Sequence, residues 1–335
     1  MAGRIEKLKE IAKKNPKKIV FPEGSEARVL EAAKIIASLG IAEVILIGEE
    51  KKIQKKISEN PIKLEDICVI DPKKHPGLEE LTETFYNLRK HKGITRDEAK
   101  KKIAEDPVYF AALLVRSGAA DGFVAGASHT TRNVARAALH CLGLDSEIGV
   151  MSSSFAIEMD TPDYGDQDGL FVFGDCGIVP NPSPMRLAGI AISSSRLYEE
   201  LFKRKARTAL LSYSTKGSGR GESVEKVREA LEIIKKKAPG LVVDGELQLD
   251  AAITPEVAKI KSPGSPIGGK ANVLIFPNLD AGNIAYKLVQ RLGNARVVGP
   301  ILEGLTKPAS DLSRGCGVQE IVDAACVVAI RAGKC

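Results

Sequence analysis

Short apolar runs alternate with longer stretches in which apolar residues recur at helical spacing along most of this 335-residue chain. The first half has strand-like runs at residues 18–21, 43–47, 67–70, 122–125 and 149–151. Helical spacing is found at residues 26–39, 107–117 and 131–142. This alternation predicts a mostly parallel sheet covered by helices on both faces.

From about residue 152 the pattern changes. Two apolar runs, 155–158 and 170–173, flank a polar segment at 160–168 and predict a β-hairpin. Alternation then resumes, with helices expected at 184–202, 222–237 and 282–292 and strands at 208–212, 242–243, 273–276 and 296–298. The Pro-, Gly- and Ser-rich tract 262–269 is expected to be a loop.

Near the end of the chain, the apolar run 297–305 leads into a loop rich in Gly, Pro and Ser. A helical pattern begins at about Val318, so Ser313 and Arg314 are expected just before a helix N-terminus. Free backbone N–H groups and the helix dipole favour an anion there. A serine hydroxyl and a guanidinium are well suited to binding a phosphate.

Composition narrows the possible classes of protein. The length favours two domains, and 44% hydrophobic with 27% charged residues is ordinary for a globular protein. Only 4% of residues are aromatic and there is no Trp, which argues against a stacking surface for nucleic acid. The net charge of +6 is modest and would favour a small polyanionic substrate.

The six cysteines form no CxxC pair, which argues against a zinc ribbon or a thioredoxin-like site. The N-terminal pattern is a charged helix rather than an apolar signal segment. No run approaches the roughly 20 apolar residues that a membrane-spanning helix needs. We therefore expect a cytoplasmic protein with free thiols and no membrane association.

Two further loops could approach a phosphate. Residues 126–131, which include Ser128, His129 and Thr130, follow a strand and open a helix, so they are either a phosphate cradle or an ordinary N-capping loop. Residues 214–221 are glycine-rich and contain Lys216. Their spacing matches neither a Walker A loop nor a dinucleotide fingerprint.

Two other features have both a chemical and a structural interpretation. Asp244, Glu246 and Asp250 follow a predicted strand and could either bind Mg²⁺ or accept hydrogen bonds from loop backbone. Cys316 lies near a helix N-terminus, where a thiolate is favoured. No nearby His motif would activate it as a nucleophile, so we expect a bystander thiol that lines the site and is sensitive to alkylation.

The segment Lys-Pro-x-x-Asp-Leu-Ser-Arg-Gly-Cys at 307–316 is very similar to the terminal motif of phosphate acetyltransferases (phosphotransacetylases). Further blocks that resemble this family occur, in family order, at residues 21–24, 88–93, 126–131, 212–218, 243–248 with 250–252, and 276–283. Together they cover nearly the whole chain.

The resemblance implies a fold of two three-layer α/β/α domains, similar to isocitrate and isopropylmalate dehydrogenases, with the site in an interdomain cleft. The first domain would comprise residues 1–150 plus 303–335 and the second, inserted domain residues 151–302. The last helix, 318–332, would pack back on the first domain. The long N-terminal extension of some relatives is missing, so we expect no regulation through such a domain.

The implied reaction is reversible acetyl transfer between acetyl-CoA and phosphate, by direct attack of the CoA thiolate on acetyl phosphate in a ternary complex. In the family, the residues that match Ser313 and Arg314 contact the acyl phosphate and stabilise the transition state. Glu320 stands where the family usually has an aspartate that acts as the base for the thiol. An acidic residue in a first helical turn is also common as a cap, and the dipole there would lower its pKa and weaken it as a base.

The resemblance also implies substrate-binding residues. Arg89 and Arg136 match arginines associated with CoA phosphates, Ser128 and Thr130 belong to a matching loop, and Lys216 would line the cleft with Cys316. No metal and no permanently bound cofactor are expected. The implied partners are coenzyme A, acetyl phosphate, inorganic phosphate and a second copy of the chain in a homodimer.

Three alternatives remain open. A branched-chain or butyryl phosphate transferase would share the fold and the serine–arginine region. A regulatory module that binds acetyl-CoA, like the transferase-like tail of some malic enzymes, would bind without turnover, but the intact motif at 311–316 argues against it. A dehydrogenase on the related fold is disfavoured because there is no dinucleotide fingerprint.

Overall fold

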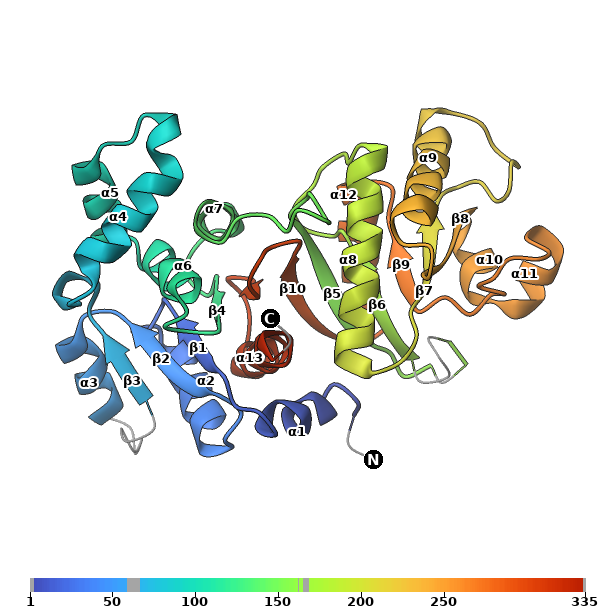
Figure 1. Cartoon of the computed structure of the whole chain (residues 1–335). Coiled ribbons are helices and arrows are strands. Elements are labelled where there is room, and N and C mark those ends of the chain that lie inside the picture. Colours follow the sequence, from blue (N-terminus) through green and yellow to red (C-terminus); the bar gives the residue numbers. More distant parts are fainter. Residues whose placement is uncertain (1–2, 59–66, 162, 165–168, 334–335) are drawn as a thin grey trace. The chain divides into compact units, whose positions relative to one another are not determined.

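The computed structural model describes residues 3–58, 67–161, 163–164 and 169–333. The chain divides into two compact units, the first comprising Met1–Gly143 with Leu305–Cys335 and the second Leu144–Gly304 (Figure 1). The boundaries expected from the sequence, at 150/151 and 302/303, differ from these by seven and two residues, respectively.

The first unit contains a parallel sheet and its covering helices. Its elements are α1 (Lys7–Lys13), β1 (Lys18–Phe21), α2 (Ala27–Ser38), β2 (Glu43–Ile47), α3 (Glu50–Ser58), β3 (Ile67–Ile70), η2 (Pro72–Lys74), α4 (Leu78–Arg89), η3 (Lys90–Lys92), α5 (Arg96–Glu105), α6 (Pro107–Ser117), β4 (Gly122–Ala125), α7 (Thr131–Cys141), β11 (Ala309–Asp311) and α13 (Val318–Ala332).

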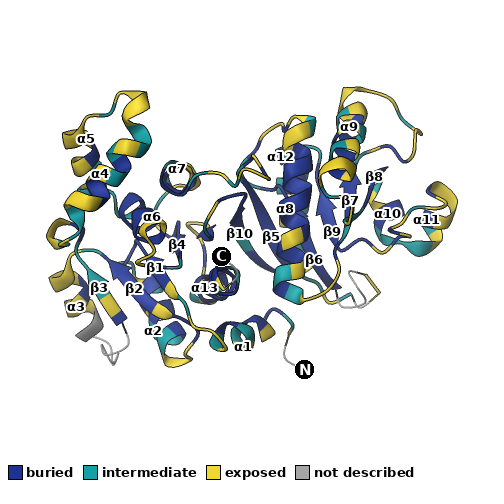
Figure 2. Cartoon of the chain, viewed as in Figure 1, coloured by how far each residue is buried: buried dark blue, intermediate teal, exposed yellow. Residues whose placement is uncertain are grey.

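The strands of this unit lie in the order β3-β2-β1-β4-β11, and every neighbouring pair is parallel. Helices α2 and α13 pack together on one face, while α6 packs against β1 and β4 on the other (Figure 1). Every residue of β4 is buried, as expected for a central strand covered on both faces (Figure 2). The last helix thus packs against the elements that begin the chain.

The second unit contains a mixed sheet. Its elements are β5 (Ser152–Glu158), β6 (Leu170–Gly174), α8 (Pro184–Phe202), β7 (Arg207–Leu211), α9 (Glu222–Lys237), β8 (Val242–Leu247), α10 (Leu249–Ile253), α11 (Pro255–Lys261), β9 (Val273–Ile275), α12 (Leu279–Arg291) and β10 (Arg296–Glu303).

The order in this unit is β10-β5-β6-β9-β7-β8, with antiparallel pairing from β10 to β6 and parallel pairing from β6 to β8. Strands β5 and β6 are antiparallel neighbours, as the predicted hairpin requires. Residues 162 and 165–168 of the connecting segment lie outside the described part of the chain.

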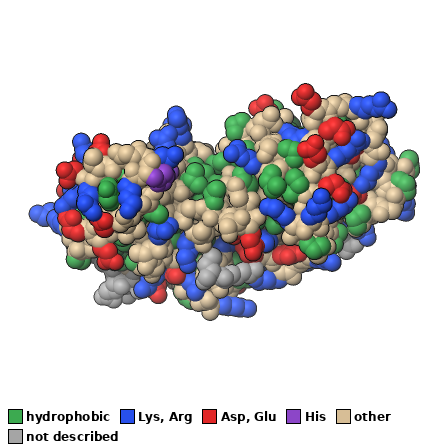
Figure 3. All heavy atoms as spheres, turned by 45° about the horizontal axis from the view of Figure 1, so that its top comes forward, with side chains coloured by type: hydrophobic (Ala, Val, Ile, Leu, Met, Phe, Trp, Pro, Cys, Tyr) green, Lys and Arg blue, Asp and Glu red, His purple; other side chains and the backbone are tan. Residues whose placement is uncertain are grey.

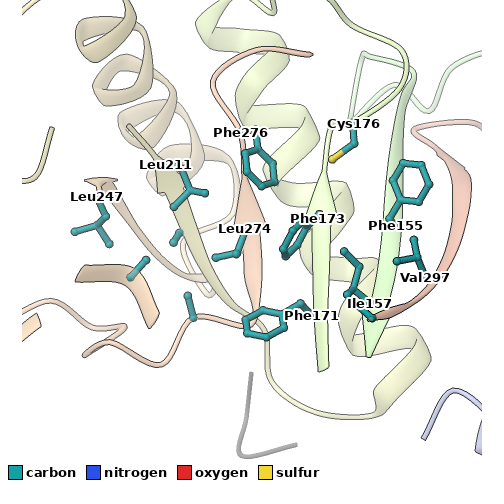
Figure 4. Close-up of a cluster of buried hydrophobic side chains, with 14 of the residues drawn as sticks. Phe155, Ile157, Phe171, Phe173, Cys176, Leu211, Leu247, Leu274, Phe276 and Val297 are labelled. Carbon is teal, nitrogen blue, oxygen red and sulfur yellow. The ribbon is translucent and has the colours of Figure 1, made fainter. Parts of the chain in front are cut away.

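One face of this sheet carries the core cluster shown in Figure 4, to which Phe155, Phe173, Leu211, Leu274 and Phe276 belong. The ring of Phe155 stacks on Tyr286 of α12, with 4.2 Å between ring centroids. Helices α8 and α9 pack on the other face. Each unit is therefore a three-layer α/β/α arrangement, as the sequence predicts.

Local signals fix many helix boundaries. Ser183 caps α8 by accepting a hydrogen bond from the Arg186 N–H, and Pro184 occupies the first turn. Asp106 and Pro107 open α6 in the same way. No described helix is long and apolar enough to cross a membrane.

Four sequence-based expectations need correction. Strand β8 runs to Leu247 rather than ending at 243, so Asp244 and Glu246 lie within the strand. Strand β10 continues through Gly299 and Pro300 to Glu303, and β11 was not expected at all. Residues 149–151 precede β5 and form no strand.

Candidate active site

Three neighbouring strands of the first unit bring chemistry-bearing loops to one end of its sheet. Strand β4 pairs in parallel with β1 on one side and with β11 on the other, where Asp311 lies opposite Ala125. The loops after these strands contain Glu23, residues 126–130 and residues 312–317. The carboxyl ends of parallel strands are the usual place for a ligand site in open α/β sheets.

Glu23 accepts hydrogen bonds from four consecutive backbone N–H groups. Its Oε2 accepts from Gly126 and Ala127 at 3.0 and 2.8 Å. Its Oε1 accepts from Ser128 and His129 at 2.7 and 2.8 Å. The side chains of Ser128 and His129 also donate to Oε1, at 3.0 and 2.8 Å. A single buried carboxylate therefore shapes the whole loop.

Burial by itself would raise the pKa of Glu23, but the hydrogen bonds from His129, Ser128 and Ala127 outweigh it and lower the pKa to about 2. The four N–H groups are already bound to this carboxylate. The sequence-based idea that they cradle a phosphate is therefore wrong for this conformation. The capping interpretation is confirmed, because Thr130 Oγ1 accepts from the Asn133 N–H at the start of α7.

Gly126 could not be another residue. Its φ is +116°, and a Cβ there would lie 2.5 Å from Asp311 Oδ1 and from the Leu312 nitrogen. The loops after β4 and β11 thus approach each other closely at backbone level.

Arg28, from the first turn of α2, ties these two loops together. Its Nη2 donates to the Ala127 carbonyl at 2.9 Å. Its Nη1 donates to the carbonyls of Arg314 and Cys316 at 2.9 and 2.7 Å. The sequence pattern indicated no role for Glu23 or Arg28. The position of Glu23 directly after a strand was the available signal, whereas Arg28 had none.

The loop with Ser313 and Arg314 lies where the sequence predicts, just before α13 begins at Val318. Both residues are exposed. The Ser313 hydroxyl accepts from the Gly315 N–H at 3.3 Å. Among the described residues, the Arg314 guanidinium has no hydrogen-bond or ion-pair partner. The motif therefore presents a hydroxyl and an unpaired cation to solvent.

Glu320 acts as a cap in this conformation. Its Oε2 accepts a hydrogen bond of 2.6 Å from the Gly317 N–H, in the first turn of α13. One carboxylate oxygen is thus bound by the helix terminus.

Cys316 is 4% exposed, and burial raises the pKa of its thiol to about 11, more than the Arg28 charge lowers it. The expectation that the helix terminus favours a thiolate here is therefore wrong. With its thiol protonated and covered, Cys316 is neither a nucleophile nor an easily alkylated group.

Asp311, at the end of β11, is fully buried. Burial raises its pKa to about 7, hydrogen bonding from Thr131 and Leu312 opposes this increase, and the nearby Glu23 charge adds to it. Two carboxyl groups with very different pKa values, about 2 for Glu23 and about 7 for Asp311, therefore lie at this end of the sheet.

Arg89 and Arg136 lie near each other in the first unit, around His140. Arg89 ends α4, Arg136 and His140 are one turn apart on α7, and these two helices are in contact. Burial lowers the pKa of His140 to about 4, and the charges of Arg89 and Arg136 lower it further. Neither guanidinium has a partner among the described residues. Figure 3 shows a surface histidine beside Lys and Arg side chains, and all four histidines belong to this unit.

Lys216 belongs to the second unit and has a partner there. Its φ is +47°, and its ammonium group donates to the Asp244 carboxylate and to the Gly245 carbonyl at 3.2 Å. Glu246 accepts from the Gly217 N–H at 2.8 Å and from both Nε and Nη2 of Arg228. Asp244 and Glu246 thus hold the 214–217 loop, as the hydrogen-bonding interpretation predicts, whereas Asp250 pairs with Lys261 at 2.6 Å. The described residues include no cluster suited to a metal ion.

Comparisons with known proteins now define the class. The family described as phosphate acetyl/butaryl transferase matches residues 4–329. A phosphate acetyltransferase from Acetivibrio thermocellus is 47% identical over 328 residues, 98% of each chain. A phosphotransacetylase from Streptococcus pyogenes has a TM-score of 0.92 at 38% identity, covering 99% of this chain and 98% of that one.

A 4-hydroxythreonine-4-phosphate dehydrogenase from Klebsiella pneumoniae has a TM-score of 0.53 at 14% identity, covering 95% of this chain and 99% of that one. That likeness concerns the fold alone, and it agrees with the predicted dehydrogenase-like α/β class. Fold and family together define an acyltransferase enzyme. The chain belongs to the phosphate acetyl/butaryl transferase family.

Proposed function

We propose that this enzyme transfers an acetyl group reversibly between acetyl-CoA and phosphate, forming acetyl phosphate and CoA. The observation that carries the proposal is the exposed Ser313–Arg314 pair before α13, in a chain 47% identical to a phosphate acetyltransferase. An unpaired guanidinium is the group best suited to a phosphate that changes charge during the reaction.

In this mechanism CoA and acetyl phosphate are bound together, and the thiolate attacks the acetyl carbonyl directly. Arg314 and Ser313 stabilise the tetrahedral oxyanion and the departing phosphate. The raised pKa of Cys316 supports direct transfer, because a protonated, buried thiol is a poor acyl carrier. The role proposed for Cys316 is then to pack beneath the loop as a buried side chain.

Arg89 and Arg136 are proposed to bind phosphate groups of CoA. Their unpaired charges lie close enough to affect the same histidine, so one polyanion could engage both. We propose smaller roles for Ser128 and Thr130, whose hydroxyls already contact Glu23 and the Asn133 N–H. Lys216 would have to exchange its Asp244 partner for a substrate phosphate.

Glu320 is the proton acceptor that the family pattern implies for the CoA thiol. To serve in this role it must use its free oxygen or release the Gly317 N–H. Replacing Glu320 with Gln and measuring turnover across pH separates this role from that of a helix cap. Normal activity at every pH would leave only the cap.

The decisive assay mixes purified protein with CoA and either acetyl phosphate or butyryl phosphate and follows thioester formation. We expect fast turnover with acetyl phosphate and little with butyryl phosphate. The reverse preference would keep the mechanism and change the substrate. Binding of CoA without thioester from either would make the chain a binding module and remove the catalytic roles.

We also propose a homodimer. Ile284, Leu288 and Leu292 recur at one-turn spacing on α12 and its C-cap and are 59%, 50% and 81% exposed, an apolar stripe suited to a second copy. Sedimentation should give a dimer that Leu288→Asp dissociates, and a monomeric wild type would contradict this.

The five described cysteines are all free, which supports the proposed cytoplasmic location.

A further inference from the structure

Glu23 and His129 form a carboxylate–imidazole pair that the roles proposed so far leave unused. Glu23 Oε1 and His129 Nδ1 are 2.8 Å apart, and the two side chains are 2% and 25% exposed, respectively. The carboxylate is therefore hidden, while part of the imidazole reaches the surface. A buried carboxylate behind a histidine fixes both the orientation of the ring and its tautomer.

The tautomer follows from the charge of Glu23. Because its pKa is about 2, Glu23 is ionised and can only accept hydrogen bonds. His129 Nδ1 must carry the hydrogen, which leaves a lone pair on Nε2 of the neutral ring. Among the described residues nothing hydrogen-bonds to Nε2. The imidazole thus has one occupied nitrogen and one available nitrogen.

The loop that contains His129 adjoins the loop that contains the reacting groups proposed above. His129 is two residues after Ala127, whose carbonyl shares the Arg28 guanidinium with the carbonyl of Arg314. The strands that lead into these two loops, β4 and β11, are hydrogen-bonded neighbours. His129 and the Ser313–Arg314 pair therefore occupy adjoining loops at one end of the sheet.

We propose that His129 is the catalytic residue that accepts the proton of the CoA thiol, and that Glu23 is its positioning residue. This rests on the proposed function. One oxygen of Glu320, the competing acceptor, is bound by the Gly317 N–H, whereas the accepting nitrogen of His129 has no partner among the described residues. The ring is also oriented in advance by a partner that nothing needs to displace.

The proton balance closes without another reactant. The S–H bond of CoA breaks and its proton moves to Nε2, while the sulfur forms a bond to the acetyl carbon. The bond from that carbon to the phosphate oxygen then breaks. The imidazolium returns the proton to the departing phosphate, which leaves as hydrogen phosphate. Thiol and acetyl phosphate become thioester and hydrogen phosphate, and the enzyme is restored.

Three charged groups, together with burial, act on the imidazole. The hydrogen bond to Glu23 is the largest and raises the pKa of His129, burial opposes it, and Asp106 raises it further while Lys102 lowers it. The net result is a pKa above 6.5. Thioester formation needs the neutral ring, so kcat/KM should fall as pH drops through this raised pKa.

The test is His129→Asn in the full-length enzyme. The asparagine amide can still donate to Glu23, as Nδ1 does, but it has no nitrogen to accept a proton. We expect kcat to fall about 10²- to 10⁴-fold and the acidic limb of the pH profile to disappear, with KM values within about threefold of wild type. His75→Asn is the matched control, because His75 is also half-buried and its Nδ1 only accepts from the Gly77 N–H.

Glu23→Gln supplies a second readout that a purely structural role would not give. Loss of the carboxylate removes the largest cause of the raised His129 pKa, so the acidic limb should move to lower pH. This variant keeps the proposal testable if His129→Asn fails to fold in thermal unfolding. The limb would stay in place if Glu23 only held the loop.

Two outcomes overturn the proposal: a folded His129→Asn enzyme with kcat within about threefold of wild type, or an acidic limb that disappears in Glu320→Gln and persists in His129→Asn. Either result would return the proton transfer to another group. A wild-type protein that forms no thioester would instead contradict the proposed function, so the two failures are distinguishable.

Discussion

Two loops of this protein, one in each unit, are organised by a buried glutamate whose pKa is lowered to about 2. Glu23 holds residues 126–129, and Glu246 holds residues 214–217. The two glutamates differ in the side chain that donates nitrogen hydrogen bonds to them. Glu246 receives two hydrogen bonds from the Arg228 guanidinium, whereas Glu23 binds only one nitrogen of His129.

As a result, the partner of Glu246 is fully used in holding its loop, whereas the partner of Glu23 keeps one nitrogen free. The bonds from Arg228 satisfy Glu246 with a group that never titrates near neutral pH. The bond from His129 leaves a titratable nitrogen available on the loop that adjoins the one with the unpaired Arg314. A buried glutamate therefore only holds a loop in the second unit, whereas in the first unit it also orients the proposed catalytic histidine.

After His129→Asn, the largest effect should come from comparing Arg314 with Arg228. Arg314→Gln should lower kcat about 10²- to 10³-fold, because it removes an unpaired cation from the developing negative charge. Arg228→Gln should leave kcat within about threefold, because that guanidinium is committed to Glu246. Steady-state kinetics on both variants, with unfolding curves as the folding control, make the comparison. Near-normal turnover of Arg314→Gln would exclude its role.

Stability should also separate the two glutamates. Glu23→Gln should lower the free energy of unfolding by about 2–4 kcal/mol, because the amide NH₂ group that replaces one oxygen cannot accept the backbone N–H bonds. Glu246→Gln should cost about 1–3 kcal/mol, since it accepts from only one backbone N–H of its loop and weakens a partly exposed ion pair. Urea unfolding measures both, and the reverse order would contradict this.

The pH dependence of stability tests the partners. The pKa values of Glu23 and Glu246 are both lowered. The stability that these carboxylates contribute is therefore present above about pH 4.5 and is lost as the pH falls towards 2. The pKa of His129 is raised, so its contribution is present below 6.5 and is lost as pH rises through the folded value. The unfolding free energy should therefore have an alkaline decrease that His129→Asn removes and Arg228→Gln retains.

The smallest effect concerns Lys216. Lys216→Ala should raise the KM of acetyl phosphate only about two- to fivefold, equivalent to about 0.5–1 kcal/mol, with kcat unchanged, because Asp244 already engages the ammonium group. Arg89→Ala, which removes an unpaired charge, is the comparison and should raise the KM of CoA more. A tenfold or larger change for Lys216→Ala would mean that this loop opens to substrate.

Helices could be predicted well from the sequence because their signals are local. The bounds of α8 and α9 follow from Ser183, Pro184 and Gly221 together with helical spacing. The Ser313–Arg314 loop could be found for the same reason, since the helix that follows it begins where its apolar pattern begins.

Strands and the contacts of the site residues were harder to predict from the sequence, because they depend on partners that are far away along the chain. Strand β8 contains Asp244 and Glu246, which a strand tolerates only because Lys216 and Arg228 pair with them. The short β11 has no alternating pattern and is buried on all sides. Glu23 finds its N–H partners more than 100 residues later in the chain, so no local motif reveals the contact.

The bond from Arg28 to Arg314 joins positions 286 residues apart, with the whole of Leu144–Gly304 between them. During synthesis the second unit emerges from the ribosome before the strand and loop that complete the first. The acetyl-transfer site proposed here therefore cannot exist on a partly made chain, and β4 must wait with one edge uncovered until β11 arrives. Each molecule can thus become active only after β11 has been synthesised. Chaperones that shield exposed sheet edges would act between the synthesis of β4 and that of β11.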